Sequence, residues 1–174
     1  MNIGEALEAE HSKAQTIRIA GFVGDSKSRF RELAGFVLGS EPVLAQRAAW
    51  AVTQCAEEFP HLVFPHLQKL LENLRRKDLL DGVKRNTMKV AAELEIPDEY
   101  AGLAADVAFE LLASPGEAVA VKVHSMSVLE QLCLREPALV EEFRMTLDEL
   151  APVEKKPVFR SKLRHVRKTL AKLE

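Results

Sequence analysis

Val83-Lys84-Arg85-Asn86-Thr87-Met88-Lys89-Val90-Ala91-Ala92-Glu93-Leu94 carries apolar or small residues at its first, fifth, eighth and twelfth places. This spacing puts those four residues on one face of an α-helix, because about 3.6 residues make one helical turn. Charged and polar residues dominate the other faces, as in an amphipathic helix with one buried side. The stretch therefore predicts a helix that packs against other helices through this apolar face.

The same pattern occurs four times, at a constant spacing of 38 residues. Aligned without gaps, the four helices begin at Ala45, Val83, Val121 and Phe159. The fifth and eighth places hold Ala49 and Val52, Thr87 and Val90, Ser125 and Val128, and Leu163 and Val166. The twelfth places hold Ala56, Leu94, Leu132 and Leu170. Three equal spacings indicate an internal repeat of a helical unit that packs on its neighbours.

A second apolar stripe precedes each of these helices. The stripes run over Phe30 to Leu38, Leu62 to Leu74, Tyr100 to Leu112 and Leu139 to Leu150. Each unit is therefore predicted to be helix, turn, helix, turn, and we place the repeats at about 25–59, 60–96, 97–136 and 137–174. Residues 1–24 do not match the register and are expected to form an N-terminal cap, because a terminal unit has only one neighbour.

The motif Val-Lys-x-x-Thr-x-x-Val-Ala-Ala-x-Leu from Val83 to Leu94 resembles the second helix of a HEAT repeat, as does the segment Val121 to Leu132. The resemblance covers about residues 25–173. It implies an all-α fold: a right-handed α-α superhelix of about four HEAT-like helical pairs in one repeat domain, residues 1–174. The first helices would form its convex face and the second helices its concave face. The turn Asp of the family is present only as Asp78, and its helix Arg only as Arg160.

The composition is that of a globular protein. The chain has 174 residues, of which 47% are hydrophobic, and a formal net charge of -2. This near-neutral balance argues against a uniformly basic, nucleic-acid-binding surface. Two cysteines cannot form a disulfide framework, and no apolar run approaches the roughly 20 residues that span a bilayer. The acidic start, Met1 to Glu10, does not resemble a signal peptide. We therefore expect a cytoplasmic protein that does not bind membranes.

The charges are unevenly distributed along the chain. Residues 153–174 contain eight basic and two acidic residues, whereas residues 1–152 contain 16 and 24. One interpretation is that cations stabilise the C-terminus of the last helix and keep a terminal cap soluble. The other is a contact with an acidic partner or with nucleic acid, or self-association in which the basic end meets the acidic body of another copy.

The candidate binding residues are basic. The third and seventh places of the second helices point away from their apolar faces, and would line the concave surface of the predicted superhelix. Together with the basic C-terminal helix, they give a candidate site of Arg47, Arg85, Lys89, Arg160, Arg164, His165 and Lys168. Such a surface suits an acidic peptide or a phosphate backbone. The alternative is a solvated helix face, with Lys84, Lys122 and Arg160 bonding nearby turn groups.

No catalytic or metal-binding constellation is evident in the sequence. The five histidines are dispersed, and no Gly-rich phosphate loop or Cys-x-x-Cys motif occurs. Cys55 and Cys133 are expected to be buried small hydrophobes. The sixth places, Trp50, Met88 and Met126, are interpreted as core rather than as a binding groove. We assign no catalytic residue, metal ligand or cofactor.

Two functions remain open. The first is a non-enzymatic protein-interaction or scaffold module that binds an unidentified, acidic partner on its concave face. The alternative is a nucleic-acid-binding protein or a DNA-repair enzyme, because a family of alkylpurine DNA glycosylases is built from HEAT-like repeats. The resemblance implies that those enzymes use inward aromatic residues at the lesion. The chain has only one Trp and one Tyr, Trp50 and Tyr100, which favours the first function.

Overall fold

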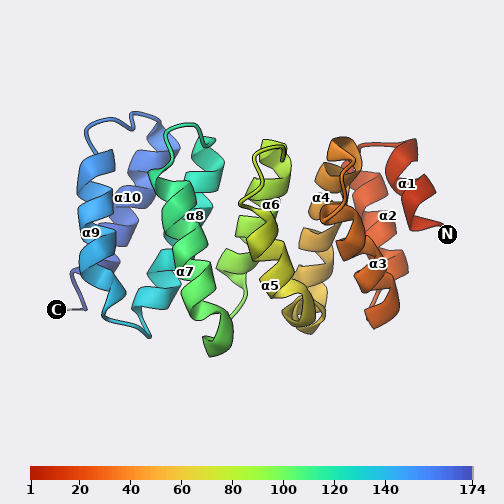
Figure 1. Cartoon of the computed structure of the whole chain (residues 1–174), viewed down its shortest axis with the longest axis horizontal. Helices are drawn as coiled ribbons and strands as arrows, with labels where there is room; N and C mark the ends of the chain where they lie inside the picture. The colour runs from red at the N-terminus through yellow and green to blue at the C-terminus, as the bar shows by residue number, and fades with distance from the viewer. Residues whose placement is uncertain (174) are drawn as a thin grey trace. The chain divides into compact units, whose positions relative to one another are not determined.

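The computed structural model describes residues 1–173, which fold into α-helices connected by short turns (Figure 1). Ten α-helices and one short 3-10 helix are present, and no strand occurs between residues 1 and 173. The all-α fold class is therefore confirmed. The helices are α1 (Ile3–Ala9), α2 (Lys13–Val23), α3 (Lys27–Val37), α4 (Pro42–Glu58), η1 (Pro60–Leu62), α5 (Phe64–Asn73), α6 (Asp81–Glu93), α7 (Asp98–Ala113), α8 (Val119–Cys133), α9 (Leu139–Leu150) and α10 (Pro157–Leu170).

The helices form two compact units, one of residues 1–97 and one from Asp98 onward. The division falls between the predicted second and third repeats. In the first unit, α4 packs against both α2 and α6, while α3 packs against α1 and α5. In the second unit, α8 packs against α10 and α7 against α9. Each unit thus has one layer of first helices and one layer of second helices. The single continuous domain, the right-handed superhelix and its concave face stay predictions.

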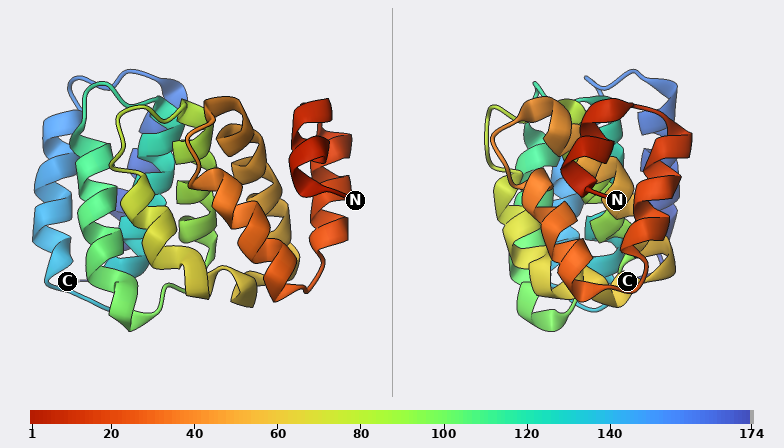
Figure 2. Two further views of the ribbon diagram at one scale, coloured as in Figure 1. Left: turned by 45° about the vertical axis from the view of Figure 1, so that its right-hand side comes forward. Right: turned by 90° about the vertical axis from the view of Figure 1, so that its right-hand side faces the viewer.

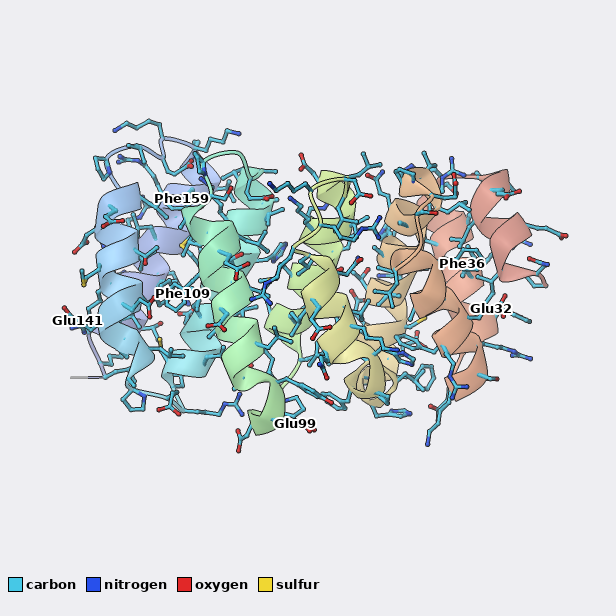
Figure 3. All side chains as sticks on the ribbon, viewed as in Figure 1. Glu32, Phe36, Glu99, Phe109, Glu141 and Phe159 are labelled. Atoms are coloured by element: carbon cyan, nitrogen blue, oxygen red, sulfur yellow. The ribbon has the colours of Figure 1, made fainter. Side chains whose placement is uncertain are left out.

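The repeated apolar places form the core of each unit. All the first, fifth and eighth places of α4, α6, α8 and α10 are buried. At the twelfth place Leu94, Leu132 and Leu170 are buried, whereas Ala56 is half-buried and its neighbour Cys55 is buried instead. Aromatic residues complete the packing of the second unit, where the rings of Phe109 in α7 and Phe143 in α9 meet edge to face at 6.2 Å. Phe109 is labelled in Figure 3.

The N-terminal cap is itself a short helical pair. Helix α1 ends at Ala9, and α2 begins at Lys13. The side chain of Ser12 accepts a hydrogen bond from the backbone N–H of Gln15 at the start of α2. A Ser at this position satisfies one of the N–H groups that a helix start leaves unpaired. Helix α2 then packs against α4, as α4 packs against α6. Helices α1 and α2 are drawn in red to orange in Figure 2, beside the pair α3 and α4.

Candidate functional site

Arg47, in the first unit, contributes to the fold. It is half-buried in α4, and its Nη1 donates to the carbonyl oxygen of Leu7 at 2.6 Å and to that of Glu8 at 3.0 Å. Both carbonyls belong to the last turn of α1, where a helix leaves its final C=O groups without partners and a cation is favourable. Arg47 therefore holds α1 onto α4 and is not a free cation on an open surface.

Lys89 and Arg85 of α6 have different surroundings. Lys89 Nζ lies 3.2 Å from Glu57 Oε1 of α4 and 3.8 Å from Glu93 Oε1 of its own helix. Its charge is therefore balanced by two carboxylates. Arg85 is exposed, and within residues 1–173 its side chain makes no hydrogen bond or ion pair. Of the three predicted cations of the first unit, Arg85 alone presents an unpaired charge among the described residues.

The remaining candidates lie on α10 of the second unit. Arg160 Nη2 donates to the carbonyl oxygen of Ala151 at 3.3 Å, and His165 Nε2 lies 3.0 Å from Glu130 Oε1. Arg164 and Lys168 are exposed and have no partner in the part of the chain that the structure describes. Because residues four apart lie on one face of a helix, Arg160, Arg164 and Lys168 form a row along α10.

Glu130 of α8 is the central acceptor of a polar cluster on another side of α10. Its Oε2 accepts from Lys162 Nζ at 2.6 Å, and its Oε1 accepts from Thr169 Oγ1 at 2.6 Å. Burial alone would raise the pKa of this carboxyl, but the hydrogen bonds from Lys162 and Thr169 and the charges of Lys162 and His165 lower it overall. Glu130 thus joins α8 to α10 as a carboxylate. Its role was not predicted from the sequence; the available signal was that Thr169 follows it by 39 residues, which is about one repeat.

Lys122 forms a second link in the same unit. Only 2% of its side chain is exposed, and its Nζ lies 2.5 Å from Glu154 Oε1. Lys122 occupies the place of the HEAT-repeat Arg, and Glu154 lies in the turn before α10, at the place of the HEAT-repeat Asp. Lys122 and Arg160 thus both bond groups of the turn before α10, as expected for these two residues, whereas the same expectation for Lys84 stays a prediction.

The other notable residues are structural. Met88 and Met126 are fully buried, which confirms their assignment to the core, and Trp50 is half-buried with its ring 5.4 Å from that of His11. Burial, together with nearby Glu58 for Cys55 and Glu130 for Cys133, raises the pKa of the Cys55 thiol to about 12 and that of the Cys133 thiol to about 11. Both cysteines are therefore protonated near neutral pH and are poor nucleophiles.

The described residues contain neither a metal-binding cluster nor a membrane span. Within residues 1–173 no group of three or more His, Cys, Asp or Glu side chains is arranged to hold a metal ion. Between the same limits, no helix is both long and apolar enough to cross a lipid bilayer.

The comparison with protein families places the whole helical array in one family. A model of the HEAT repeat domain matches residues 3–170, which includes the N-terminal pair α1 and α2. Comparisons with curated proteins and with solved structures gave no match. HEAT repeats commonly serve as scaffolds for protein interactions. Because the family match spans nearly the entire chain and coincides with the 38-residue repeat of helical pairs, the chain belongs to the HEAT repeat domain family.

Proposed function

We propose that this chain is a non-enzymatic interaction scaffold that binds an acidic protein segment along α10. The observation that carries the proposal is the row of Arg160, Arg164 and Lys168, all exposed and spaced four residues apart. Like charges at this spacing repel one another and weaken a helix by a few tenths of a kcal/mol. A carboxylate-bearing partner would relieve this repulsion, and the row extends over about 12 Å, which is about four residues of an extended peptide.

The charges around the row support an acidic partner. Helix α10 contains five Lys and Arg residues and no carboxylate. Lys162 and Arg167 are already paired with Glu130 and Asp148, each at 2.6 Å. Their positive charges are thus balanced within the unit, whereas those of Arg164 and Lys168 are directed to solvent. In the predicted superhelix α10 would be one of the helices of the concave face, together with Arg85 of α6.

Self-association follows from the same charge pattern. Helices α7 and α9 together contain eight carboxylates and a single cation, Arg144. Glu99 and Glu141 of these helices are exposed and point away from the ribbon (Figure 3). A second copy therefore offers an acidic surface for α10, and light scattering at increasing protein concentration tests whether it is used.

The experiment compares two double charge reversals with the same change in net charge. Arg164→Glu with Lys168→Glu alters the row, whereas Lys13→Glu with Lys77→Glu alters two exposed lysines of the first unit. Fluorescently labelled poly-glutamate is the probe, measured by anisotropy. We expect the first variant to lose at least about tenfold in affinity and the second to bind like the wild type.

Three outcomes would decide against this proposal. Equal losses in both variants would mean that net charge alone attracts the probe. Failure of the wild type to bind poly-glutamate at low salt would rule out an acidic protein segment as the partner. Binding to a DNA duplex that falls steeply between two salt concentrations, without binding to poly-glutamate, would instead support the nucleic-acid alternative. Arg85→Glu tests separately whether the second helices of the first unit take part.

A further inference from the structure

A pocket of about 430 Å³ opens between α3 and α5, within the first unit. Lys27 and Arg31 reach it from α3, and Lys69 reaches it from α5. His61 and His66 complete its polar lining. The volume is in the range of small-ligand sites, which are roughly 300–1,000 Å³.

The lining of this pocket is positively charged. Of the described residues that line it, none is a carboxylate. Asp25 lies at the rim, where its Oδ1 is 2.6 Å from His61 Nε2. Burial lowers the pKa of His66, and the charges of Arg31 and Lys69 lower it further. The cations therefore create a positive potential inside the pocket, where His66 lies.

The rest of the pocket wall is apolar, and at Gly35 no side chain covers it. Ala34, Leu38, Leu62 and Pro65 contribute apolar surface. Gly35 lies in the last turn of α3 and is exposed. An added Cβ at Gly35 would meet no atom within 4 Å, so packing does not require the glycine. The missing side chain leaves the pocket wall open beside the helix backbone.

The corresponding groove of the second unit lacks this charge. It lies between α7 and the turn that leads from α8 into α9, and is lined by Asp98, Gly102, Arg135 and Glu136 among others. Its one cation is neutralised, since Arg135 Nη1 lies 3.0 Å from Asp98 Oδ1. Both units thus have a pocket beside a first helix, but of these two pockets only the one in the first unit has a cluster of cations.

From these observations we propose that the pocket between α3 and α5 binds a small amphipathic anion, a phosphate monoester of an apolar group. The phosphate would lie among Lys27, Arg31 and Lys69, because a dianion matches several cations and a guanidinium can donate two hydrogen bonds to phosphate. The apolar group would cover Leu38 and Leu62. The site is separate from α10 and does not depend on the function proposed for that helix.

The test uses phenyl phosphate as the probe and isothermal titration calorimetry of the full chain. Gly35→Leu would place a side chain in the pocket, while Gly102→Leu makes the same change in α7, where an added Cβ also meets nothing within 4 Å. Lys69→Met removes one cation from the pocket, and Lys13→Met removes an exposed cation elsewhere. We expect Gly35→Leu and Lys69→Met to weaken binding by about tenfold or more, and both controls to leave it unchanged.

Several results would overturn the proposal. These are no binding of phenyl phosphate at about 10 mM, equal binding to the Gly35→Leu and Gly102→Leu variants, or equal affinity for neutral phenol. If inorganic phosphate binds as tightly as phenyl phosphate, the apolar part of the site is wrong. Circular dichroism verifies that Gly35→Leu is folded, and Lys69→Met decides the outcome if it is not. Arg164→Glu with Lys168→Glu should retain phenyl phosphate binding, which separates this site from the function of α10.

Discussion

Replacing Glu154 by Gln is expected to destabilise the second unit much more than replacing Lys122 by Met. The side chains lie 2.5 Å apart, but only 2% of Lys122 is exposed, against 22% of Glu154. Glu154→Gln preserves the size of the side chain and leaves an ammonium group in a site that water does not reach. Removing one partner of a buried pair costs about 3–5 kcal/mol. We expect about 3 kcal/mol, because the Gln oxygen still accepts a hydrogen bond.

Replacing Lys122 instead leaves the negative charge of Glu154, which water can still reach. Lys122→Met fills the same space with an apolar chain, and the carboxylate of Glu154 is partly solvated. We expect this variant to lose about 1 kcal/mol, and the double variant to lie within about 1 kcal/mol of the wild type, since a buried pair and an apolar replacement are often nearly equal in stability. The coupling between the two substitutions should then be about 3–5 kcal/mol, because the two single losses sum to about 4 kcal/mol.

Urea unfolding followed by circular dichroism measures these differences, because urea is uncharged and does not screen the ion pair. The single tryptophan, Trp50, lies in α4, so its fluorescence follows the first unit. Asp148→Asn is the matched control, since it breaks an exposed pair with Arg167 and should cost no more than about 1 kcal/mol. Equal losses from Glu154→Gln and Lys122→Met, or a double variant no more stable than Glu154→Gln, would refute the reasoning.

Three further predictions concern the other buried polar groups. Arg47→Ala should lower the free energy of unfolding by about 1–3 kcal/mol in thermal unfolding, because two carbonyls of α1 lose their donor, while Arg85→Ala should change it by less than about 0.5 kcal/mol. The folded-state pKa of Glu130 lies below 4.5, so its contribution to stability is present above that pH and is lost as the pH falls through the lowered pKa. Glu130→Gln should therefore flatten the acid limb of a plot of stability against pH; an unchanged limb would contradict the assignment. Cys55 and Cys133 should react with Ellman's reagent at about pH 8 only after unfolding in urea, and fast reaction of the native protein would show that they are accessible thiolates.

The sequence predicted the helical pairs because the repeat reports burial directly. A position that is apolar in every 38-residue unit faces the interior in every unit, whatever the exact path of the chain. The division between α1 and α2 was missed for a physical reason. It occurs at Glu10-His11-Ser12, where no Pro or Gly interrupts the chain and the signal is a single capping Ser. Because many serines do not cap helices, such a signal is weak on its own.

The candidate site was harder to predict, since a helix position does not reveal which groups cover it. No role was predicted for Glu130, yet it accepts from Lys162 and Thr169 of the next second helix. The pocket between α3 and α5 was not predicted either. Its cations come from different repeats and from places that the 38-residue alignment of second helices does not include.

Arg47 and Arg85 show why the same place in two repeats can have different roles. Both occupy the third place of a second helix, so the repeat pattern predicts the same role for both. In the structure α1 and α2 pack against α4. The guanidinium of Arg47 therefore meets the C-terminal end of α1 and caps it by donating to a free carbonyl oxygen. No carbonyl or carboxylate of residues 1–173 meets Arg85, which stays exposed. A repeat pattern therefore predicts which direction a side chain points, whereas its function depends on whether a neighbouring helix occupies that direction. In this chain the terminal pair, α1 and α2, covers the third place of the neighbouring second helix, α4. In the first unit, binding through the second helices should therefore depend on Arg85 and not on Arg47.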